Sequence, residues 1–237
     1  MYKENVTITS VDVDQNLELR LSNLFKYFQL VGSNHVKKLG ASHQDLINHN
    51  VLWVVIRMDV KIFRMPKLDE EVVFMTHPGE TRSFVFPRHF HVFDKKGNLI
   101  ISSSSMWALM DKDTRKVVLK PEGLVKIKSE SSKYDLPLPD KVVGDAPSKI
   151  MTNKVRYTDI DLNGHLNNTS YIEFILNTHK PEFYKENKIS SISINYDKEI
   201  RSTDEVTLCS NNSNPEIIKG NVGEFTHFAA KLEYIKR

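Results

Sequence analysis

The sequence predicts an α+β protein in which one structural unit, a helix with an antiparallel sheet, is used twice. Residues 17–40 place apolar side chains at helical spacing. The residues after them alternate apolar and polar side chains, which is typical of strands with one buried face. The same order returns after a polar segment in the middle of the chain. Because a sheet with one apolar face needs a layer to cover it, each half is expected to bury its own helix.

The first half contains one predicted helix followed by predicted strands. Apolar side chains on one face of the helix come from Leu21, Leu24, Phe25, Phe28 and Val31, and the pattern ends at a glycine. Strands are expected within residues 53–65, 70–79, 82–93, 98–111 and 116–120. A turn is expected at the Asp-Lys-Lys-Gly sequence that ends at Gly97.

Residues 121–150 mix Pro, Ser, Gly and charge with little periodicity, which is typical of a linker that wraps a surface. The linker separates a predicted N-terminal unit, residues 1–120, from a predicted C-terminal unit, residues 151–237. An offset of 145 residues superposes the predicted helices of the two halves. It places Asp161, Asn163 and His165 opposite Asn16, Glu18 and Arg20, and a second correspondence places Glu199 opposite Arg64.

The composition is that of an ordinary globular protein. The chain has 237 residues, 40% of them hydrophobic and 27% charged, and its net charge of +3 is far from that of a nucleic-acid-binding protein. Its first residues, MYKENVTITS, lack the pattern of a signal peptide, and no apolar stretch is long enough to span a membrane. The single cysteine, Cys209, allows no intramolecular disulfide, so a cytoplasmic location is expected.

The stretch DIDLNGHLNN, residues 159–168, resembles the start of a calcium-binding EF-hand loop. Asp159, Asp161, Asn163 and Gly164 occupy the first, third, fifth and sixth positions of such a loop. The twelfth position, which needs a bidentate carboxylate, is Ser170. The preceding KVRYTDI alternates like a strand rather than an entering helix. We therefore predict no metal here.

The same stretch contains residue types suited to hydrolysis. Asn167 and Asn168 can cap the helix that follows, which places Asp161, Asn163 and His165 just before a helix N-terminus. Free backbone N–H groups and the helix dipole stabilise negative charge there, as an oxyanion requires. A carboxylate, an amide and an imidazole can orient and deprotonate water. The structural alternative is that the Asp and Asn residues only form turns and caps while His165 packs.

Two other polar groups have weaker signals. His89 and His91 lie on one face of a predicted strand, but the sequence shows no third metal ligand beside them, so a surface or core role is favoured. The serines from Ser102 to Ser105 lack a nucleophile elbow and are interpreted as strand residues. No metal and no cofactor is expected.

Four segments of the sequence form a recognisable set: D-x-N-x-H with NN-x-x-Y at residues 161–171, INYDKE at 194–199, LWVVIRM at 52–58 and SSMWALMDKDTRK at 104–116. Together they resemble the acyl-acyl carrier protein thioesterases of plant plastids and bacteria. The resemblance implies a double hotdog, two tandem units that each wrap an antiparallel sheet around a long central helix. It also implies catalytic roles for Asp161, Asn163, His165 and Glu199. Many plant members have a cysteine directly after the glutamate, where this chain has Ile200.

The implied activity is hydrolysis of fatty acyl-acyl carrier protein (acyl-ACP) to free fatty acid and carrier protein, in fatty acid biosynthesis. The expected partner is therefore the carrier protein with its acyl-phosphopantetheine arm, and a homodimer is compatible with the sequence. Two alternatives stay open, namely an acyl-CoA thioesterase on the same fold and a noncatalytic acyl-binding module. By the offset above, the first half is expected to lack the catalytic set and to enclose the acyl chain, with Phe25 and Phe28 as candidates for its pocket or for plain core.

Overall fold

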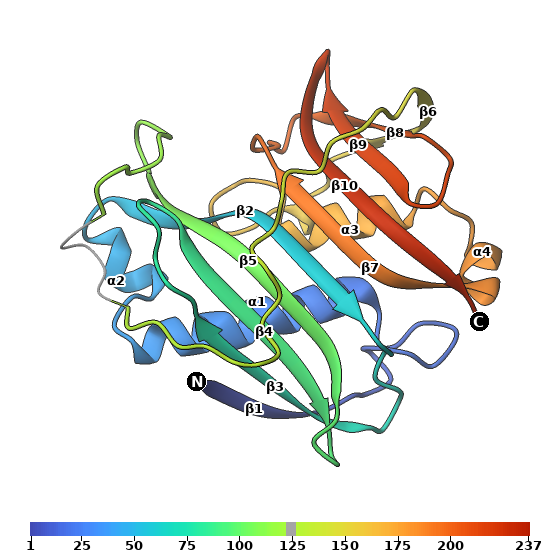
Figure 1. Ribbon diagram of the computed structural model, residues 1–237. Coiled ribbons are helices and arrows are strands. Elements are labelled where there is room, and N and C mark those ends of the chain that lie inside the picture. The colour runs from blue at the N-terminus through green and yellow to red at the C-terminus, as the bar shows by residue number, and fades with distance from the viewer. Residues whose placement is uncertain (122–126) are drawn as a thin grey trace. The chain divides into compact units, whose positions relative to one another are not determined.

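The computed structural model describes residues 1–121 and 127–237, which divide into two compact units (Figure 1). Unit 1 contains Met1–Leu19 and Lys26–Pro139, and unit 2 contains Arg20–Phe25 and Asp140–Arg237. Each unit combines an antiparallel sheet with helices, which confirms the α+β class. Among the described residues, no helix is both long and apolar enough to cross a membrane. Residues 122–126 of the predicted linker lie outside the described residues.

The sheet of unit 1 has the strand order β1-β3-β4-β5-β2, with neighbouring strands antiparallel. The elements of unit 1 are β1 (Tyr2–Thr7), α1 (Leu21–Lys38, which belongs to unit 1 from Lys26 onward), α2 (His43–Ile47), β2 (Val51–Ile62), β3 (Glu71–Pro78), β4 (Phe86–Asp94) and β5 (Leu99–Asp111). Strand β1 and helix α2 were not predicted, because both are short and carry few apolar side chains. The strand expected at residues 116–120 is wrong, because its pairing is one isolated bridge between Val117 and Met110.

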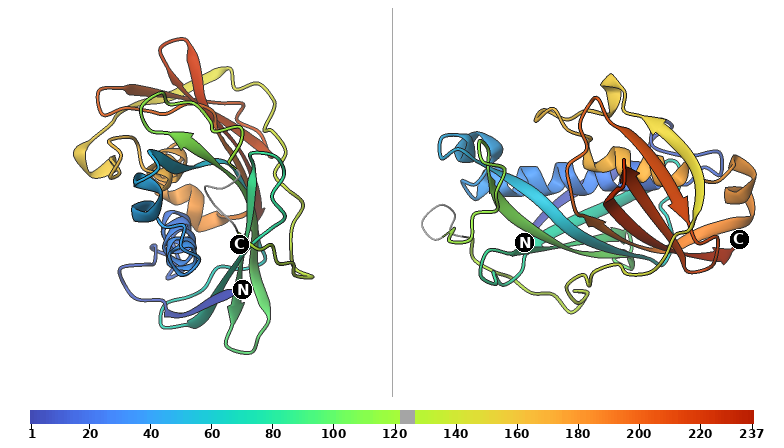
Figure 2. Two further views of the ribbon diagram at one scale, coloured as in Figure 1. Left: turned by 90° about the vertical axis from the view of Figure 1, so that its left-hand side faces the viewer. Right: turned by 90° about the horizontal axis from the view of Figure 1, so that it is seen from above.

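Helix α1 covers one face of this sheet (Figure 2). The Phe28 ring stacks on Phe90 of β4 with centroids 4.8 Å apart, and Tyr27 contacts Phe74 of β3 at 5.1 Å. Gly32 brings the helix close to the sheet, since a Cβ there would lie 3.5 Å from the Phe90 ring. Burying each large apolar side chain contributes about 1.5–3 kcal/mol. The apolar face of α1 that the sequence predicts is therefore the face that packs against the sheet.

A buried histidine of α1 contacts a buried arginine on the same side of the sheet. Arg88 Nη1 lies 3.2 Å from His35 Nδ1 and donates to it, since a guanidinium can only donate. Burial lowers the pKa of His35 to about 4, and the positive charge of Arg88 adds to this effect. Burial also lowers the pKa of Arg88 to about 10. Protonating His35 would remove its acceptor lone pair and place a second cation beside the guanidinium.

We expect acid to destabilise the protein through His35. Its folded pKa of about 4 lies below the ordinary 6.5, so between these values the unfolded chain binds more protons and stability falls as the pH falls. Between pH 7 and pH 5 this histidine alone should reduce the free energy of unfolding by about 2 kcal/mol. Urea unfolding at both pH values measures the loss. His35→Gln keeps an acceptor for Arg88 but does not titrate, so it should lose less; equal losses in both proteins would contradict the assignment.

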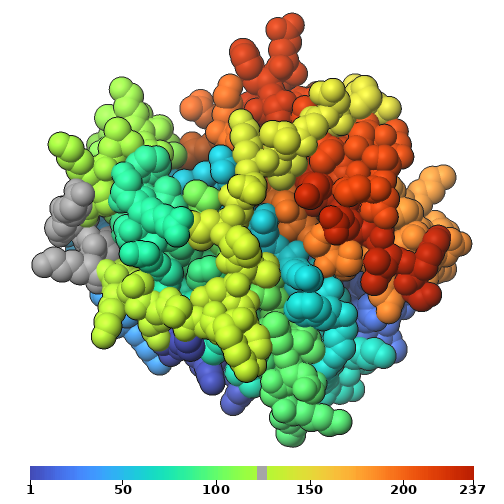
Figure 3. All heavy atoms as spheres, in the orientation of Figure 1, coloured from blue at the N-terminus to red at the C-terminus, as the bar shows by residue number. Residues whose placement is uncertain are grey.

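The opposite face of the unit 1 sheet is covered by part of the linker, residues 130–137, which we call the strap (Figures 2 and 3). Glu130 N donates to Pro78 O at 2.8 Å, at the end of β3. On β5, Ser102 Oγ donates to Tyr134 O at 2.8 Å and Ser104 Oγ donates to Pro137 O at 2.6 Å. Most of β4 is consequently buried on both faces, because α1 lies on one side and the strap on the other.

The sheet of unit 2 has the order β7-β10-β9-β8-β6, again with antiparallel neighbours. Its elements are β6 (Ser148–Lys154), the 3₁₀ turn η1 (Tyr157–Asp159), α3 (Asn168–Leu176), α4 (Pro181–Glu186), β7 (Asn187–Tyr196), β8 (Glu205–Ser210), β9 (Glu216–Val222) and β10 (Phe225–Lys236). Tyr171 of α3 packs edge-on against Tyr196 and Phe228 with centroids 5.2 and 5.1 Å apart. With nine residues, α3 is half as long as the 18-residue α1.

A candidate active site in the loop before helix α3

The carboxylate of Asp161 holds together the loop that carries the candidate residues. Its Oδ1 accepts hydrogen bonds from the backbone N–H groups of Asn163 at 2.8 Å and His165 at 3.1 Å. Its Oδ2 lies 3.2 Å from Asn163 Nδ2, and its own N–H donates to His165 O at 2.8 Å. Gly164 has a φ of +80°, a conformation that side chains rarely adopt. Asp161 thereby fixes the backbone from which Asn163 and His165 project.

Both ends of this loop are also fixed by short side chains. Asp159 Oδ2 accepts from Arg156 N at 2.8 Å across η1, so the strand expected through KVRYTDI is interrupted by a turn. Asn167 caps α3, because its Oδ1 accepts from Thr169 N at 3.0 Å. Asn168 is the first residue of the helix rather than a second cap. This geometry gives Asp159 a structural role and places the candidate residues directly before a helix N-terminus.

Glu199 joins the loop from the segment that follows β7. Its Oε2 lies 3.3 Å from Nε2 of His165. Leu166 N donates to Ile200 O at 2.8 Å, and His165 forms a β-bridge with Arg201, so the two segments are paired through their backbones. Ile200 is fully buried. Residues 34 positions apart in the chain are thus held as one imidazole–carboxylate pair.

Two supporting residues were not found from the sequence. His227 of β10 lies with Nδ1 3.0 Å from Glu199 O, and because a carbonyl only accepts, this nitrogen carries the hydrogen. Burial lowers the pKa of His227, which favours the neutral ring. Asp204 Oδ2 accepts from Arg201 N at 2.7 Å and closes the turn after Glu199. Neither residue belongs to a local motif, so only their contacts reveal these roles.

The imidazole and the carboxylate are partly exposed. The side chains of His165 and Glu199 are 20% and 32% exposed, so water can reach both. On helix α3, which follows the loop, burial raises the pKa of Tyr171 and keeps its hydroxyl protonated. An imidazole oriented by a carboxylate can take a proton from water, and an adjacent amide can hold water or a carbonyl. The arrangement is suited to hydrolysis of an activated acyl group.

Unit 1 contains a loop with the same backbone geometry. Asp14 Oδ1 accepts from Asn16 N at 2.7 Å, Asn16 Nδ2 lies 3.2 Å from Asp14 Oδ2, and Asp14 N donates to Glu18 O at 2.9 Å. Leu17 has a φ of +59°, which matches the left-handed conformation of Gly164. The β-bridge between Val13 and Leu19 corresponds to the bridge between Ile160 and Leu166.

These equivalences correct the offset of 145 to 147, since Asp14 matches Asp161 and Leu19 matches Leu166. The expectation that Asn16 corresponds to Asp161 is therefore wrong, and so is the pairing of Arg64 with Glu199. Leu19 N donates to Pro66 O as Leu166 N donates to Ile200 O, which places Met65 opposite Glu199. Unit 1 thus keeps the Asp and Asn of the loop but has Glu18 in place of the imidazole and Met65 in place of the carboxylate.

The two proposed pocket residues are both buried on α1. Phe25 is 5% exposed and belongs to unit 2, whereas Phe28 is 2% exposed and packs in unit 1. Phe28 contacts the rings of Phe74 and Phe90, so it is a core residue of its unit. A role for either ring in binding an acyl chain stays a prediction.

Comparison with known proteins shows the family to which the chain belongs. Residues 1–127 match the acyl-ACP thioesterase N-terminal domain, and residues 144–228 match the acyl-ACP thioesterase C-terminal domain. The palmitoyl-acyl carrier protein thioesterase of Cuphea hookeriana is 25% identical over 84% of this chain and 52% of its own length. The oleoyl-acyl carrier protein thioesterase 2 of Arabidopsis thaliana is 24% identical over 90% of this chain and 64% of its own. The chain spans about half the length of the first of these chloroplastic relatives.

Solved structures agree with this assignment at the level of the fold. An acyl-ACP thioesterase of Bacteroides thetaiotaomicron is similar with a TM-score of 0.88 and 24% identity, over 98% of this chain and 97% of the other. The 12:0-ACP thioesterase of Umbellularia californica has a TM-score of 0.85 and 20% identity, over 100% and 97% of the two chains. The double hotdog class is confirmed. With both of its domain models matched in order along the sequence, the chain belongs to the acyl-ACP thioesterase family.

Proposed function

We propose that this protein hydrolyses fatty acyl-ACP to a free fatty acid and the carrier protein with its phosphopantetheine thiol. The observation that supports this most is the meeting of Asp161, Asn163, His165 and Glu199 in unit 2, in a chain of this family. The curated relatives named above are thioesterases of palmitoyl- and oleoyl-acyl carrier protein. Because the proposed product is a free fatty acid, we also propose a role in fatty acid biosynthesis.

In the proposed mechanism, His165 takes a proton from a water molecule as that water attacks the thioester carbonyl. Glu199 orients the imidazole from 3.3 Å. Asn163 holds the water or the carbonyl oxygen, and Asp161 keeps both residues in place through its backbone hydrogen bonds. The positive end of the α3 dipole stabilises the negative charge that develops on that oxygen. The thiolate leaves readily, because a thiol of pKa about 8.5 needs little acid assistance.

Water rather than a thiol is the proposed nucleophile. The single cysteine of the chain, Cys209, lies in strand β8, where Asn221 Nδ2 is 3.7 Å from its Sγ. The residue directly after Glu199 is the buried Ile200, which offers no nucleophilic atom. No thioester is then formed on the enzyme, and covalent catalysis through the carboxylate of Asp161 stays the alternative to direct attack by water.

Matched substrates test the proposed carrier. The same acyl group is presented on acyl carrier protein and on coenzyme A, and kcat/KM is measured for both. We expect the carrier-protein substrate to be preferred, and its KM to rise with salt, because an acidic carrier is bound by Lys and Arg side chains. A preference for coenzyme A would instead identify an acyl-CoA thioesterase. Failure to turn over either substrate, with the acyl group bound, would identify a noncatalytic acyl-binding module.

The cytoplasmic location and the homodimer stay predictions. Cell fractionation and sedimentation of the purified protein measure them directly.

A further inference from the structure

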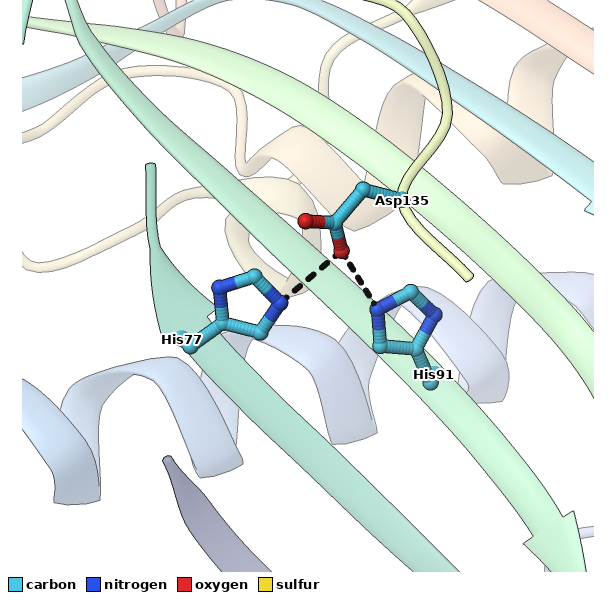
Figure 4. Close-up of side chains that lie close together, drawn as sticks. All are labelled: His77, His91 and Asp135. Carbon is cyan, nitrogen blue, oxygen red and sulfur yellow. Dashed lines mark hydrogen bonds and ion pairs between the residues drawn. The ribbon is translucent and has the colours of Figure 1, made fainter. Parts of the chain in front are cut away.

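Three imidazoles and one carboxylate lie on the strap side of the unit 1 sheet, and Figure 4 shows three of these side chains, those of His77, His91 and Asp135. His77 of β3 is paired with His89 of β4, and His91 follows two residues later on the same face. Asp135 of the strap places Oδ1 2.9 Å from His77 Nε2 and 3.0 Å from His91 Nε2. The sequence analysis found no third ligand beside the two histidines of β4, and the strap supplies one.

A hydrogen-bonded chain behind His91 orients its ring. Ser102 Oγ lies 2.8 Å from Tyr134 O and 3.2 Å from His91 Nδ1. The serine has one hydroxyl hydrogen, and the carbonyl can only accept, so the shorter contact takes that hydrogen. His91 Nδ1 must then carry a hydrogen and donate it to Ser102. In the neutral ring this leaves the Nε2 lone pair directed at Asp135.

That arrangement matches the outer shell of a metal-binding histidine. Metal-ligating histidines donate their second ring N–H to an oxygen, which fixes the tautomer and the ring orientation. With the ring neutral, a lone pair on His91 Nε2 faces a carboxylate oxygen at 3.0 Å, and these two acceptors repel unless a proton or a metal ion lies between them.

The site is enclosed and contains further ring nitrogens that can act as metal ligands. His77 and His91 are fully buried, and the side chain of Asp135 is 19% exposed. Nδ1 of His77 and Nδ1 of His89 are buried without a hydrogen-bond partner among the described residues. His89 Nδ1 lies 3.9 Å from Asp135 Oδ1, which makes it the nearest candidate for a fourth donor. Gly79 leaves room for this ring, since a Cβ there would lie 3.1 Å from His89 Nε2.

We propose that His77 Nε2, His91 Nε2 and Asp135 Oδ1 bind a divalent transition-metal ion, best matched by zinc, that fastens the strap to the unit 1 sheet. The three ligand atoms lie within 4.8 Å of one another. A tetrahedral zinc with bonds of about 2.0–2.1 Å separates its ligands by about 3.3 Å, so an outward movement of the Asp135 carboxylate by a few tenths of an ångström brings its two N–O distances to this value. Imidazole with carboxylate suits zinc better than calcium or magnesium, which prefer oxygen alone.

Metal titration of the purified protein, free of any polyhistidine tag and treated with a chelator, tests the proposal. Calorimetry with Zn²⁺ should show one ion bound per chain with a Kd in the micromolar range or tighter, and Zn²⁺ should raise Tm. Asp135→Asn and His91→Gln should each weaken binding at least tenfold. Ser102→Ala keeps all three ligands but removes the orienting contact, so we expect binding roughly tenfold weaker.

Matched controls separate this site from other histidines. His179→Gln removes the imidazole of another histidine–carboxylate pair, with Glu216 at 2.7 Å, and His165→Gln removes that of the proposed active site. Both should keep the zinc affinity of the wild type, and loss in either would overturn the proposal. So would binding that Asp135→Asn leaves unchanged, or no binding to the wild type at 100 µM free Zn²⁺ (a probe concentration about a hundred times a micromolar Kd).

One measurement requires no variant and therefore does not depend on a variant folding. X-ray absorption of the cobalt-loaded wild type should show at least two imidazole ligands with oxygen completing the shell. Fewer than two imidazoles would overturn the proposal.

Discussion

Glu199→Gln is expected to lower kcat for acyl-ACP hydrolysis by about 10²- to 10³-fold. Glutamine has the shape of glutamate but no charge, so it can no longer orient His165 as the carboxylate does from 3.3 Å. The KM should change little, because the side chain acts on the attacking water rather than on the carrier protein. Steady-state kinetics with one acyl-ACP substrate measure both parameters, and circular dichroism checks that the fold is retained.

Glu216→Gln is the matched control for this prediction. Glu216 also pairs with a histidine of unit 2, at 2.7 Å from His179, but in a different part of the sheet. Its carboxylate is buried and accepts from Ser210 and Tyr234, so the variant should unfold at lower urea concentration. Its kcat should stay near that of the wild type. Unchanged turnover in Glu199→Gln would refute the catalytic role of the carboxylate and favour an acyl-binding module.

Asp161→Ala is expected to abolish most activity, with kcat reduced at least 100-fold. Two backbone N–H groups lose their acceptor, and the loop that positions Asn163 and His165 loses its shape. The free energy of unfolding should fall by about 1–2 kcal/mol, since the lost hydrogen bonds are partly buried. Kinetics and urea unfolding on the same preparation separate the two effects.

Asp14→Ala, in the equivalent loop of unit 1, is the matched control for Asp161→Ala. Asp14 accepts from Asn16 N in a loop of the same geometry, so its removal should cost a similar amount of stability. Glu18 and Met65 stand there in place of the catalytic pair, so kcat should be unchanged. Equal loss of kcat in both variants would show that Asp161 acts through stability alone.

The loop in unit 1 shows why the repeat was aligned two residues out of register. The offset of 145 rested on matching Leu166 and Asn168 to Leu21 and Asn23. A shift of two residues turns a helix by about 200°, so this match set opposite faces of the two helices against each other. The better signal is the polar one: VDVDQNLEL and TDIDLNGHL share two Asp, one Asn and one Leu at an offset of 147. Those residues make the hydrogen bonds of the turn, and these bonds form only when each residue stands at its own position, so the alignment cannot be shifted.

Local patterns were sufficient for features whose cause is local. Helix α1, most strands of unit 1 and the cap formed by Asn167 follow from side-chain spacing and capping chemistry. The short strand β1 was missed because its pairing partner, β3, decides its conformation. The KVVLK segment was predicted as a strand because its alternation is real, but its described pairing is limited to one isolated bridge.

By itself the sequence determined the α+β class, and it predicted a two-unit order and, through a resemblance, four residues for a proposed active site. Only the tertiary structure decided that His165 and Glu199 meet, that His227 and Asp204 support Glu199, and that unit 1 keeps Asp14 and Asn16. It also brought Asp135 to His77 and His91. The physical reason is the same in each case. Periodicity and capping are properties of neighbours in the chain, whereas hydrogen bonds between distant segments depend on which sheet face each segment covers.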